Sequence, residues 1–223
     1  MKPLYTTLLA TLLISCGSLR KGKYTEPTTN RLVQLSTVYG TVEILLSDST
    51  PLHRNNFVQL VKEHYYDSLL FHRVIQNFMV QGGDPNSKYA KAGTQLGEGG
   101  KPYTVPAEFN KQLFHKKGAL AAARDNNAAK ASSSTQFYIV QGRQYTNAGL
   151  DSVERYRMQG RKLSDSARYY YKTIGGAPHL DGNYTVYGMV TKGLYVIDSI
   201  AAQMKDGNNR PIKDIRMQMR MLH

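Results

Sequence analysis

Short runs with a two-residue apolar period recur along this chain from Leu32 onwards, and this periodicity is typical of β-strands. The clearest run is the last, in which apolar residues occupy every second position from Ile215 to Met221. The segment LVQLSTVYGTVEILL holds two further runs that meet at Tyr39 and Gly40, as in a β-hairpin. About eight such strands, two helices and no internal repeat predict a mainly β fold, a closed eight-stranded antiparallel β-barrel capped by the two helices.

Two segments have the character of helices. The first follows DSTP, where Ser49 or Thr50 would cap the helix and Pro51 would stand in its first turn. It has one apolar face and is expected to pack on the sheet. The second follows a predicted turn at Lys192 and Gly193.

A long polar segment, residues 146–176, interrupts the strand pattern. It contains LDSVERYRMQGRKLSDSARYYYKT, in which Asp151 and Ser164 could each cap a helix and positive charges exceed negative ones. Loops of this length in a compact domain tend to be functional or disordered. We expect a helical insertion, which either tunes contact with a partner or a membrane or serves as a solvated spacer.

The N-terminal residues have a different character. Residues 1–15 combine Lys2 with an apolar run that is typical of a secretion signal and too short to span a bilayer. The run ends in LISC, and Cys16 is the only cysteine of the chain. This end resembles the lipobox of bacterial lipoproteins, in which the cysteine becomes the lipidated first residue of the mature chain.

From this resemblance we expect a signal peptide at residues 1–15, a lipidated cysteine with a flexible tether at 16–31, and a folded domain at 32–223. The implied location is the bacterial cell envelope, with the membrane-anchored chain facing the periplasm. The alternative is a buried N-terminal helix with an incidental cysteine.

The chain has 223 residues and a formal net charge of +13. Such a basic balance can mark a nucleic-acid-binding protein, but no helix-turn-helix, zinc or RNA-binding signature accompanies it. The glycine-rich segment 92–109 does not match a phosphate loop, because Lys101 is followed by proline and not by serine or threonine. We therefore expect no nucleic-acid partner, and attraction to acidic lipids or acidic polypeptides instead.

One charged residue stands in an otherwise apolar run. In FHRVIQNFMVQGGDP, strand alternation places Arg73 on the same face as Phe71 and Ile75. A guanidinium on an apolar face is costly unless it has a partner or a purpose. A buried salt bridge would satisfy it, and so would an aliphatic stem that carries the charge to a rim.

Four sequence segments, taken together, carry a family resemblance. They are FHRVIQNFMVQGGD, YTVPAEF (Tyr103–Phe109), STQFYI (Ser134–Ile139) and PHLDGNYTVYG (Pro178–Gly188). In this order they resemble the cyclophilin family of peptidyl-prolyl cis-trans isomerases. The resemblance runs from about Val33 to the C-terminus and implies isomerase activity on X-Pro bonds, without a metal or other cofactor.

The resemblance also implies roles for individual residues. Arg73 matches the catalytic arginine, and His72 accompanies it without a catalytic role. The residues that match the pocket for the proline ring are Phe78, Met79, Tyr138 and Leu180. The residues that match polar or strand-edge contacts to the peptide are Gln81, Gln136, Ala123 and Arg124. The alternative for each companion is an ordinary core or strand residue.

The implied roles fit the chemistry of the X-Pro bond. Resonance keeps the peptide bond planar with a rotation barrier of ~18–20 kcal/mol. In the twisted transition state this resonance is lost and the prolyl nitrogen becomes a better acceptor, so a fixed donor favours that state. Arginine suits the task because it stays protonated and presents several rigid donors. The resemblance therefore favours catalysis over a salt bridge for Arg73.

Three positions depart from the animal members of the family. Those members usually carry tryptophan where His179 stands, histidine where Tyr184 stands and asparagine where Arg124 stands. All three belong to the expected rim of the substrate site. We therefore expect an active enzyme that is only weakly inhibited by ciclosporin, a cyclic peptide inhibitor of the family.

The leading hypothesis is a lipid-anchored, monomeric isomerase that assists the folding of exported, proline-containing polypeptides. One alternative is a holding chaperone or envelope scaffold that binds such segments without turnover. Another is a basic surface-binding module that works through the insertion. A pure binder would not need Arg73, which favours the isomerase.

Overall fold

The apolar runs form one eight-stranded antiparallel sheet in the computed structural model, which describes residues 31–222. In chain order its strands are β1 (Leu32–Thr37), β2 (Gly40–Leu46), β3 (Phe71–Ile75), β4 (Met79–Gly82), β6 (Ala119–Ala122), β8 (Phe137–Val140), β9 (Val186–Lys192) and β10 (Gln218–Leu222). Their order across the sheet is β10-β1-β2-β9-β6-β8-β4-β3. The prediction of a mainly β fold is confirmed, and so is the hairpin of β1 and β2.

The other elements connect or cover these strands. They are the helices α1 (Pro51–Lys62), α2 (Asn147–Tyr156), α3 (Asp165–Thr173) and α4 (Leu194–Ala201), the 3-10 turns η1 (Pro85–Ser87) and η2 (Pro178–Leu180), and a separate ladder of β5 (Thr104–Val105) with β7 (Ser132–Ser133). No helix within residues 31–222 combines the length and the apolar character needed to cross a membrane.

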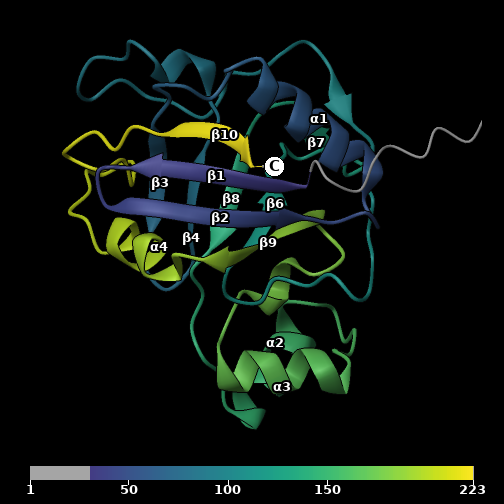
Figure 1. Cartoon of the computed structure of the whole chain (residues 1–223). Coiled ribbons are helices and arrows are strands. Elements are labelled where there is room, and N and C mark those ends of the chain that lie inside the picture. Colours follow the sequence, from purple (N-terminus) through teal and green to yellow (C-terminus); the bar gives the residue numbers. More distant parts are fainter. Residues whose placement is uncertain (1–30, 223) are drawn as a thin grey trace, which may run out of the picture.

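The sheet curls, so that β1 and β2 lie in front of β3, β4 and β8 in Figure 1. The predicted closed barrel is not confirmed, because β10 and β3 are the two edges of the sheet. Backbone bonds join the residues beside these edges, from the Val74 N–H to the Asn209 carbonyl and from the Phe71 N–H to the Ile215 carbonyl. The acceptors lie six positions apart and the donors only three, so the C-terminal segment has extra residues between these two bonds and cannot pair with β3 residue by residue there.

The inner face of the curled sheet and two helices enclose the main core. Helix α1 packs against β9 and β10, and α4 packs against β2, β3 and β4. Phe57 of α1 meets Tyr66 and Phe137 in the interior, with ring centroids 5.1 and 5.7 Å away. Burying each such ring stabilises the fold by about 1.5–3 kcal/mol. Helix α1 begins at Pro51 as predicted and Thr50 stands at its N-cap position, but the Thr50 side chain makes no capping hydrogen bond.

The segment 146–176 contains α2 and α3, which lie below the sheet in Figure 1. Ser164 caps α3 as predicted, since its hydroxyl accepts the Ala167 N–H at 3.2 Å. The prediction that Asp151 caps a helix is wrong. Thr146 caps α2 instead, and Asp151 lies inside α2, where its carboxylate pairs with Arg168 at 2.8 Å.

The insertion is attached to the sheet by close backbone contact at its C-terminal end. The Gly176 N–H bonds to the Arg143 carbonyl at 3.0 Å. A Cβ atom at Gly176 would lie 2.3 Å from the His115 carbonyl oxygen and 2.5 Å from the Tyr171 ring. Only glycine therefore allows the insertion to dock this closely, which fixes α3 against the segment that precedes β6.

Candidate active site

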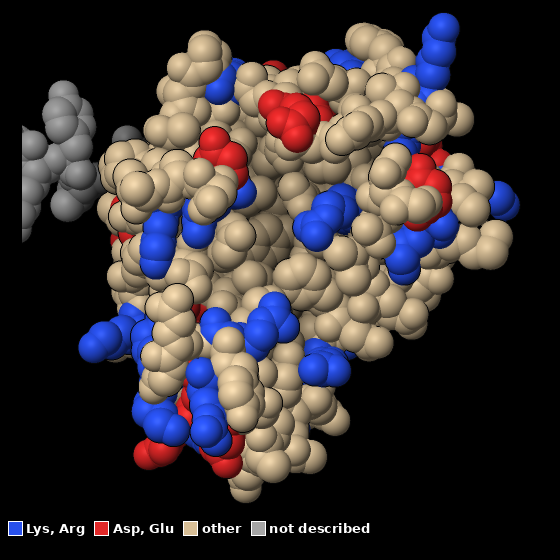
Figure 2. Space-filling view, turned by 180° about the vertical axis from the view of Figure 1, so that it is seen from behind, with Lys and Arg blue, Asp and Glu red and all other residues tan. Residues whose placement is uncertain are grey.

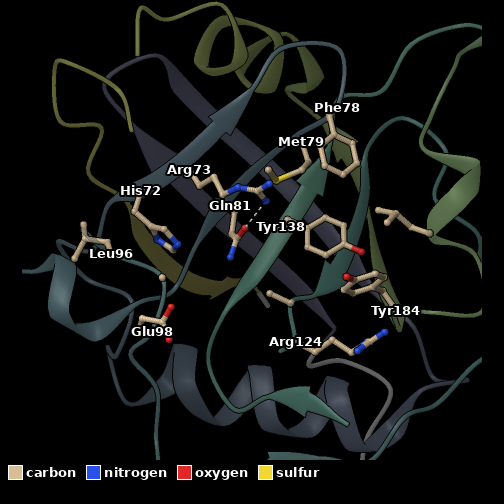
Figure 3. A pocket seen from close by; sticks show the side chains of 13 residues that line it. His72, Arg73, Phe78, Met79, Gln81, Leu96, Glu98, Arg124, Tyr138 and Tyr184 are labelled. Atoms are coloured by element: carbon tan, nitrogen blue, oxygen red, sulfur yellow. Dashed lines mark hydrogen bonds between the residues drawn. The ribbon is translucent and has the colours of Figure 1, made fainter. Parts of the chain in front are cut away.

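The candidate site lies on the outer face of the curled sheet, opposite the main core. Along β4 and β8, Val80, Phe137 and Ile139 point into the core, whereas Met79 and Tyr138 point outwards. This is the two-residue alternation of a strand. The outward residues form the floor of a cavity of about 370 Å³. Figure 3 shows Arg73 and Gln81 on one side of it and Tyr138 and Tyr184 on the other.

The sheet register brings the expected residues together. Arg73 on β3 is opposite Gln81 on β4, Gln81 is opposite Tyr138 on β8, and Tyr138 is opposite Ala121 on β6. One row across four strands therefore leads from the cation to the apolar floor. The prediction that Phe71 shares the face of Arg73 is wrong, because the register shifts between these two residues and Phe71 turns into the core.

Arg73 is half-buried, and its guanidinium donates to the Gln81 side-chain oxygen at 3.1 Å. Burial lowers the pKa of Arg73 from its ordinary value, but arginine remains charged at any working pH. Within residues 31–222 no carboxylate forms an ion pair with it. The salt-bridge interpretation of Arg73 therefore finds no partner in this part of the chain.

A chain of hydrogen bonds fixes the arginine from behind. The Gln81 amide donates to the Gln136 side-chain oxygen at 3.1 Å. The Gln136 amide in turn donates to the carbonyls of Gly97 and Gly99, at 2.7 and 2.8 Å. Gly97 has a φ of +114°, which side-chain-bearing residues rarely adopt, so glycine is required there. The loop thus orients two glutamines and, through them, Arg73.

The floor of the cavity is apolar, and its one hydroxyl, that of Tyr138, is engaged in a hydrogen bond. Phe78, Met79, Tyr138 and Leu180 all line it. The Tyr138 hydroxyl lies 2.9 Å from the His115 Nε2, a bond made beneath the pocket. Burial raises the pKa of Tyr138 well above its ordinary value, so this ring stays neutral. The floor can therefore receive an apolar ring without meeting a charge.

The rim carries two of the three positions that depart from the animal sequences, Arg124 and Tyr184, and the expectation that His179 also lies there is wrong. Ala123, Arg124 and Tyr184 line the cavity, and the Arg124 guanidinium lies 4.8 Å from the centre of the Tyr184 ring. His179 does not line it. Its ring stacks on Phe78 with centroids 5.4 Å apart, on the side of an adjoining hollow. Burial lowers the pKa of His179 to about 4, which leaves it neutral near pH 7.

His72 also faces the cavity, beside Arg73 (Figure 3). Burial lowers its pKa to about 4, against the raising influence of the Asp84 carboxylate. His72 is thus a neutral, buried neighbour of the arginine. The expectation that it plays no catalytic part stays a prediction.

Several residues of the site escaped the sequence analysis. Leu96 and Glu98 line the cavity from the glycine-rich loop, whose Gly97 and Gly99 also hold Gln136. The run of glycines in this loop, which does not match a phosphate site, was the available signal for such a role. His115 had no such signal, because its contact with Tyr138 depends on tertiary structure alone.

Comparison with known proteins identifies the family of the chain. A family model described as cyclophilin type peptidyl-prolyl cis-trans isomerase matches residues 32–220. A Staphylococcus saprophyticus relative assigned to the peptidyl-prolyl cis-trans isomerases is 36% identical over 174 residues, which are 77% of this chain and 80% of the relative. A Streptococcus pyogenes relative assigned as both a phosphatase and such an isomerase is 33% identical over 193 residues. Those residues are 85% of this chain but 38% of that relative, so this chain spans well under half of its length.

Solved structures share the fold. The crystal structure of a cyclophilin type isomerase of Cryptosporidium parvum aligns with a TM-score of 0.64 at 22% identity, covering 87% of this chain and 98% of that chain. A crystal structure from the same organism in the presence of the dipeptide Ala-Pro aligns with a TM-score of 0.62 at 20% identity, over 86% and 99% of the two chains.

A curled antiparallel sheet, with Arg73 beside an apolar cavity and no ion pair to it within residues 31–222, suits a class of enzymes that act on X-Pro bonds by binding and not by bond cleavage. The family model and the relatives place the chain within that class. The chain belongs to the cyclophilin-type peptidyl-prolyl cis-trans isomerases.

Proposed function

We propose that this isomerase acts on X-Pro bonds of exported polypeptides, as a monomer anchored in the bacterial cell envelope, with Arg73 as its catalytic residue. One observation carries the assignment of Arg73. Its guanidinium stands beside an apolar cavity, oriented by Gln81 and without an ion pair inside residues 31–222. A charge that no carboxylate neutralises keeps its donors for a substrate.

The mechanism follows from this geometry. The proline ring enters the cavity over Met79 and Tyr138, which hold it while the preceding carbonyl rotates. The residues before the proline pass along Ala123 and Arg124. As the bond twists, the lone pair of the prolyl nitrogen is no longer delocalised into the carbonyl, and Arg73 donates to this nitrogen more strongly than in the planar bond. The Cryptosporidium structure in the presence of Ala-Pro supports a proline-containing peptide as ligand.

The test is the isomerase activity of the full-length chain with Arg73→Ala and Arg73→Lys. We expect kcat/KM for an Ala-Pro tetrapeptide to fall about 10²-fold in Arg73→Ala, the scale of one preorganised donor. Arg73→Lys should recover little, because lysine lacks the planar fork of donors. Arg220→Ala, on the exposed side of β10, is the matched control. Near-normal turnover by a folded Arg73→Ala protein would refute the assignment.

The proposed envelope location rests on residues 1–15 and Cys16, which lie outside the described residues. The support is the apolar run that ends in LISC, with the sole cysteine of the chain at its end. Mass spectrometry of the mature N-terminus should find an acylated Cys16 and no preceding residues. Cys16→Ser should yield a soluble or uncleaved form. An unmodified Cys16 in the native protein contradicts the proposal.

A further inference from the structure

A second groove, of about 640 Å³, adjoins the proline pocket. The insertion supplies one wall through Met158, Leu163 and Ala167. The opposite wall includes Leu113 and Val186 from the main domain. Its volume lies within the ~300–1,000 Å³ typical of ligand pockets, so the groove can hold a few side chains but no folded partner.

The groove and the proline pocket share a wall. Tyr184 lines both cavities. Its ring packs edge-on against Tyr138 at 6.0 Å on the pocket side, and Arg124 lies over it. Figure 3 shows Tyr184 at the end of the pocket away from His72 and Arg73. A polypeptide that leaves the pocket over Tyr184 therefore enters the groove directly.

A buried hydrogen-bonded chain fixes the two sites relative to each other. The Tyr171 hydroxyl of α3 donates to one Asp181 carboxylate oxygen at 2.7 Å. The other oxygen lies 2.8 Å from the His115 Nδ1, and the His115 Nε2 lies 2.9 Å from the Tyr138 hydroxyl. This series of hydrogen bonds connects the insertion with the floor of the proline pocket. The groove is thus preformed, which reduces the ordering cost of binding.

The rim of the groove is basic. Lys111, Arg161 and Lys162 line it and are exposed. Lys162 pairs with Glu154, whereas the carboxylate of Asp181 in the same lining is taken up by His115 and Tyr171. Figure 2 shows Lys and Arg around the hollowed face and over the lower lobe, where Figure 1 places α2 and α3. Such a rim attracts acidic groups beside an apolar centre.

We propose that this groove is a second peptide-binding site, which takes an apolar segment with acidic neighbours from the same polypeptide whose proline occupies the pocket. The inference rests on the proposed function and names its substrate class. Continuity at Tyr184 selects a flanking segment of the substrate over a lipid or a second copy of this chain. The insertion then makes the enzyme selective for substrates that carry such residues near their proline.

The experiment uses the full-length chain with Lys111→Glu and Leu163→Gln, neither of which belongs to the proline pocket. Lys172→Glu is the matched control, because Lys172 is exposed on α3 and does not line the groove. Each protein is assayed on an Ala-Pro tetrapeptide and on about 12-residue peptides that add leucine and aspartate on the N-terminal or the C-terminal side. A third set replaces aspartate by lysine.

For the tetrapeptide we expect the same kcat/KM in all four proteins. For the aspartate peptides of at least one series, Lys111→Glu and Leu163→Gln should raise KM about five- to tenfold with kcat unchanged, because the groove binds ground and transition states alike. Lys111→Glu should lower KM for the matching lysine peptide. Lys172→Glu should behave as the unmodified chain.

Equal KM values for Lys111→Glu and Lys172→Glu on both extended series would overturn the proposal. So would loss of binding to anionic vesicles in Lys111→Glu with unchanged peptide KM, since a lipid would then be the occupant. Fluorescence anisotropy of the labelled extended peptides measures their binding to the groove independently of turnover. Failure of the unmodified chain on the tetrapeptide instead refutes the proposed function, so the two failures are distinguishable.

Discussion

Replacing Gln81 by methionine tests whether the glutamine chain positions Arg73. Methionine keeps the length of the side chain but removes the 3.1 Å bonds to Arg73 and to Gln136. A hydrogen bond to a charged group contributes about 1.5–3 kcal/mol. Gln81 is half-buried, so we take the lower end, and about 1.4 kcal/mol is a tenfold change in rate. We therefore expect kcat/KM for the Ala-Pro tetrapeptide to fall about tenfold in Gln81→Met.

A double-mutant cycle separates positioning from a direct role. If Gln81 acts only through Arg73, the combined Gln81→Met and Arg73→Ala protein should be no slower than Arg73→Ala alone. Gln218→Met, at an exposed position of β10, makes the same chemical change away from the site and should leave activity intact. Losses that multiply in the double variant, or unchanged turnover in Gln81→Met, would refute the reasoning.

Three further changes probe the surroundings of the site. Burial holds the pKa of His72 at about 4 in the folded protein, so as the pH drops the unfolded chain protonates this histidine first, near pH 6.5. The free energy of unfolding should therefore fall as the pH drops from 6.5 to 4. Urea unfolding of His72→Gln should show a shallower fall over the same range. His179→Trp should tighten ciclosporin binding about tenfold by adding apolar area beside Phe78, whereas tight inhibition of the unmodified chain would contradict this, as would no gain on substitution. Glu154→Gln should speed amide hydrogen exchange in α2 and α3 without slowing tetrapeptide turnover, because it weakens the buried anchor of Lys162 and Arg168; unchanged exchange would count against that anchor.

The strands were predictable because they obey a local rule, and the errors fall where that rule is broken. Alternation placed β1 and β2 correctly. It failed at Phe71, where a register shift turns one residue inwards. It also failed to foresee that the sheet stays open, because a bulge between Asn209 and Ile215 depends on distant packing. Local periodicity predicts neither a register shift nor a bulge.

The candidate site was predictable only through the family resemblance, and its supports were not. Arg73, Gln81 and Gln136 carry no local sign that they form one hydrogen-bonded chain. The contacts of Gln136 with Gly97 and Gly99 span more than 35 positions, as do those of His115 with Asp181. Asp151 illustrates the opposite error, since a good capping residue became an ion-pair partner when Thr146 began the helix earlier. Contacts between residues that are distant in the sequence decide such roles, and the local pattern of a single sequence does not predict those contacts.

Hydrogen-bonding order alone does not make a site, and one cluster in this protein shows why. His53 lies 2.7 Å from Glu108 and 2.9 Å from the Ser132 hydroxyl, the connectivity of a nucleophilic triad. Yet Ser132 is 1% exposed and His53 3% exposed, and the adjoining void of about 10 Å³ holds one water at most. Glu108 also accepts the first N–H groups of α1, so the cluster secures the loop to the helix. Arg73 differs because it reaches an open cavity with donors still to give, and that combination is what an X-Pro bond requires.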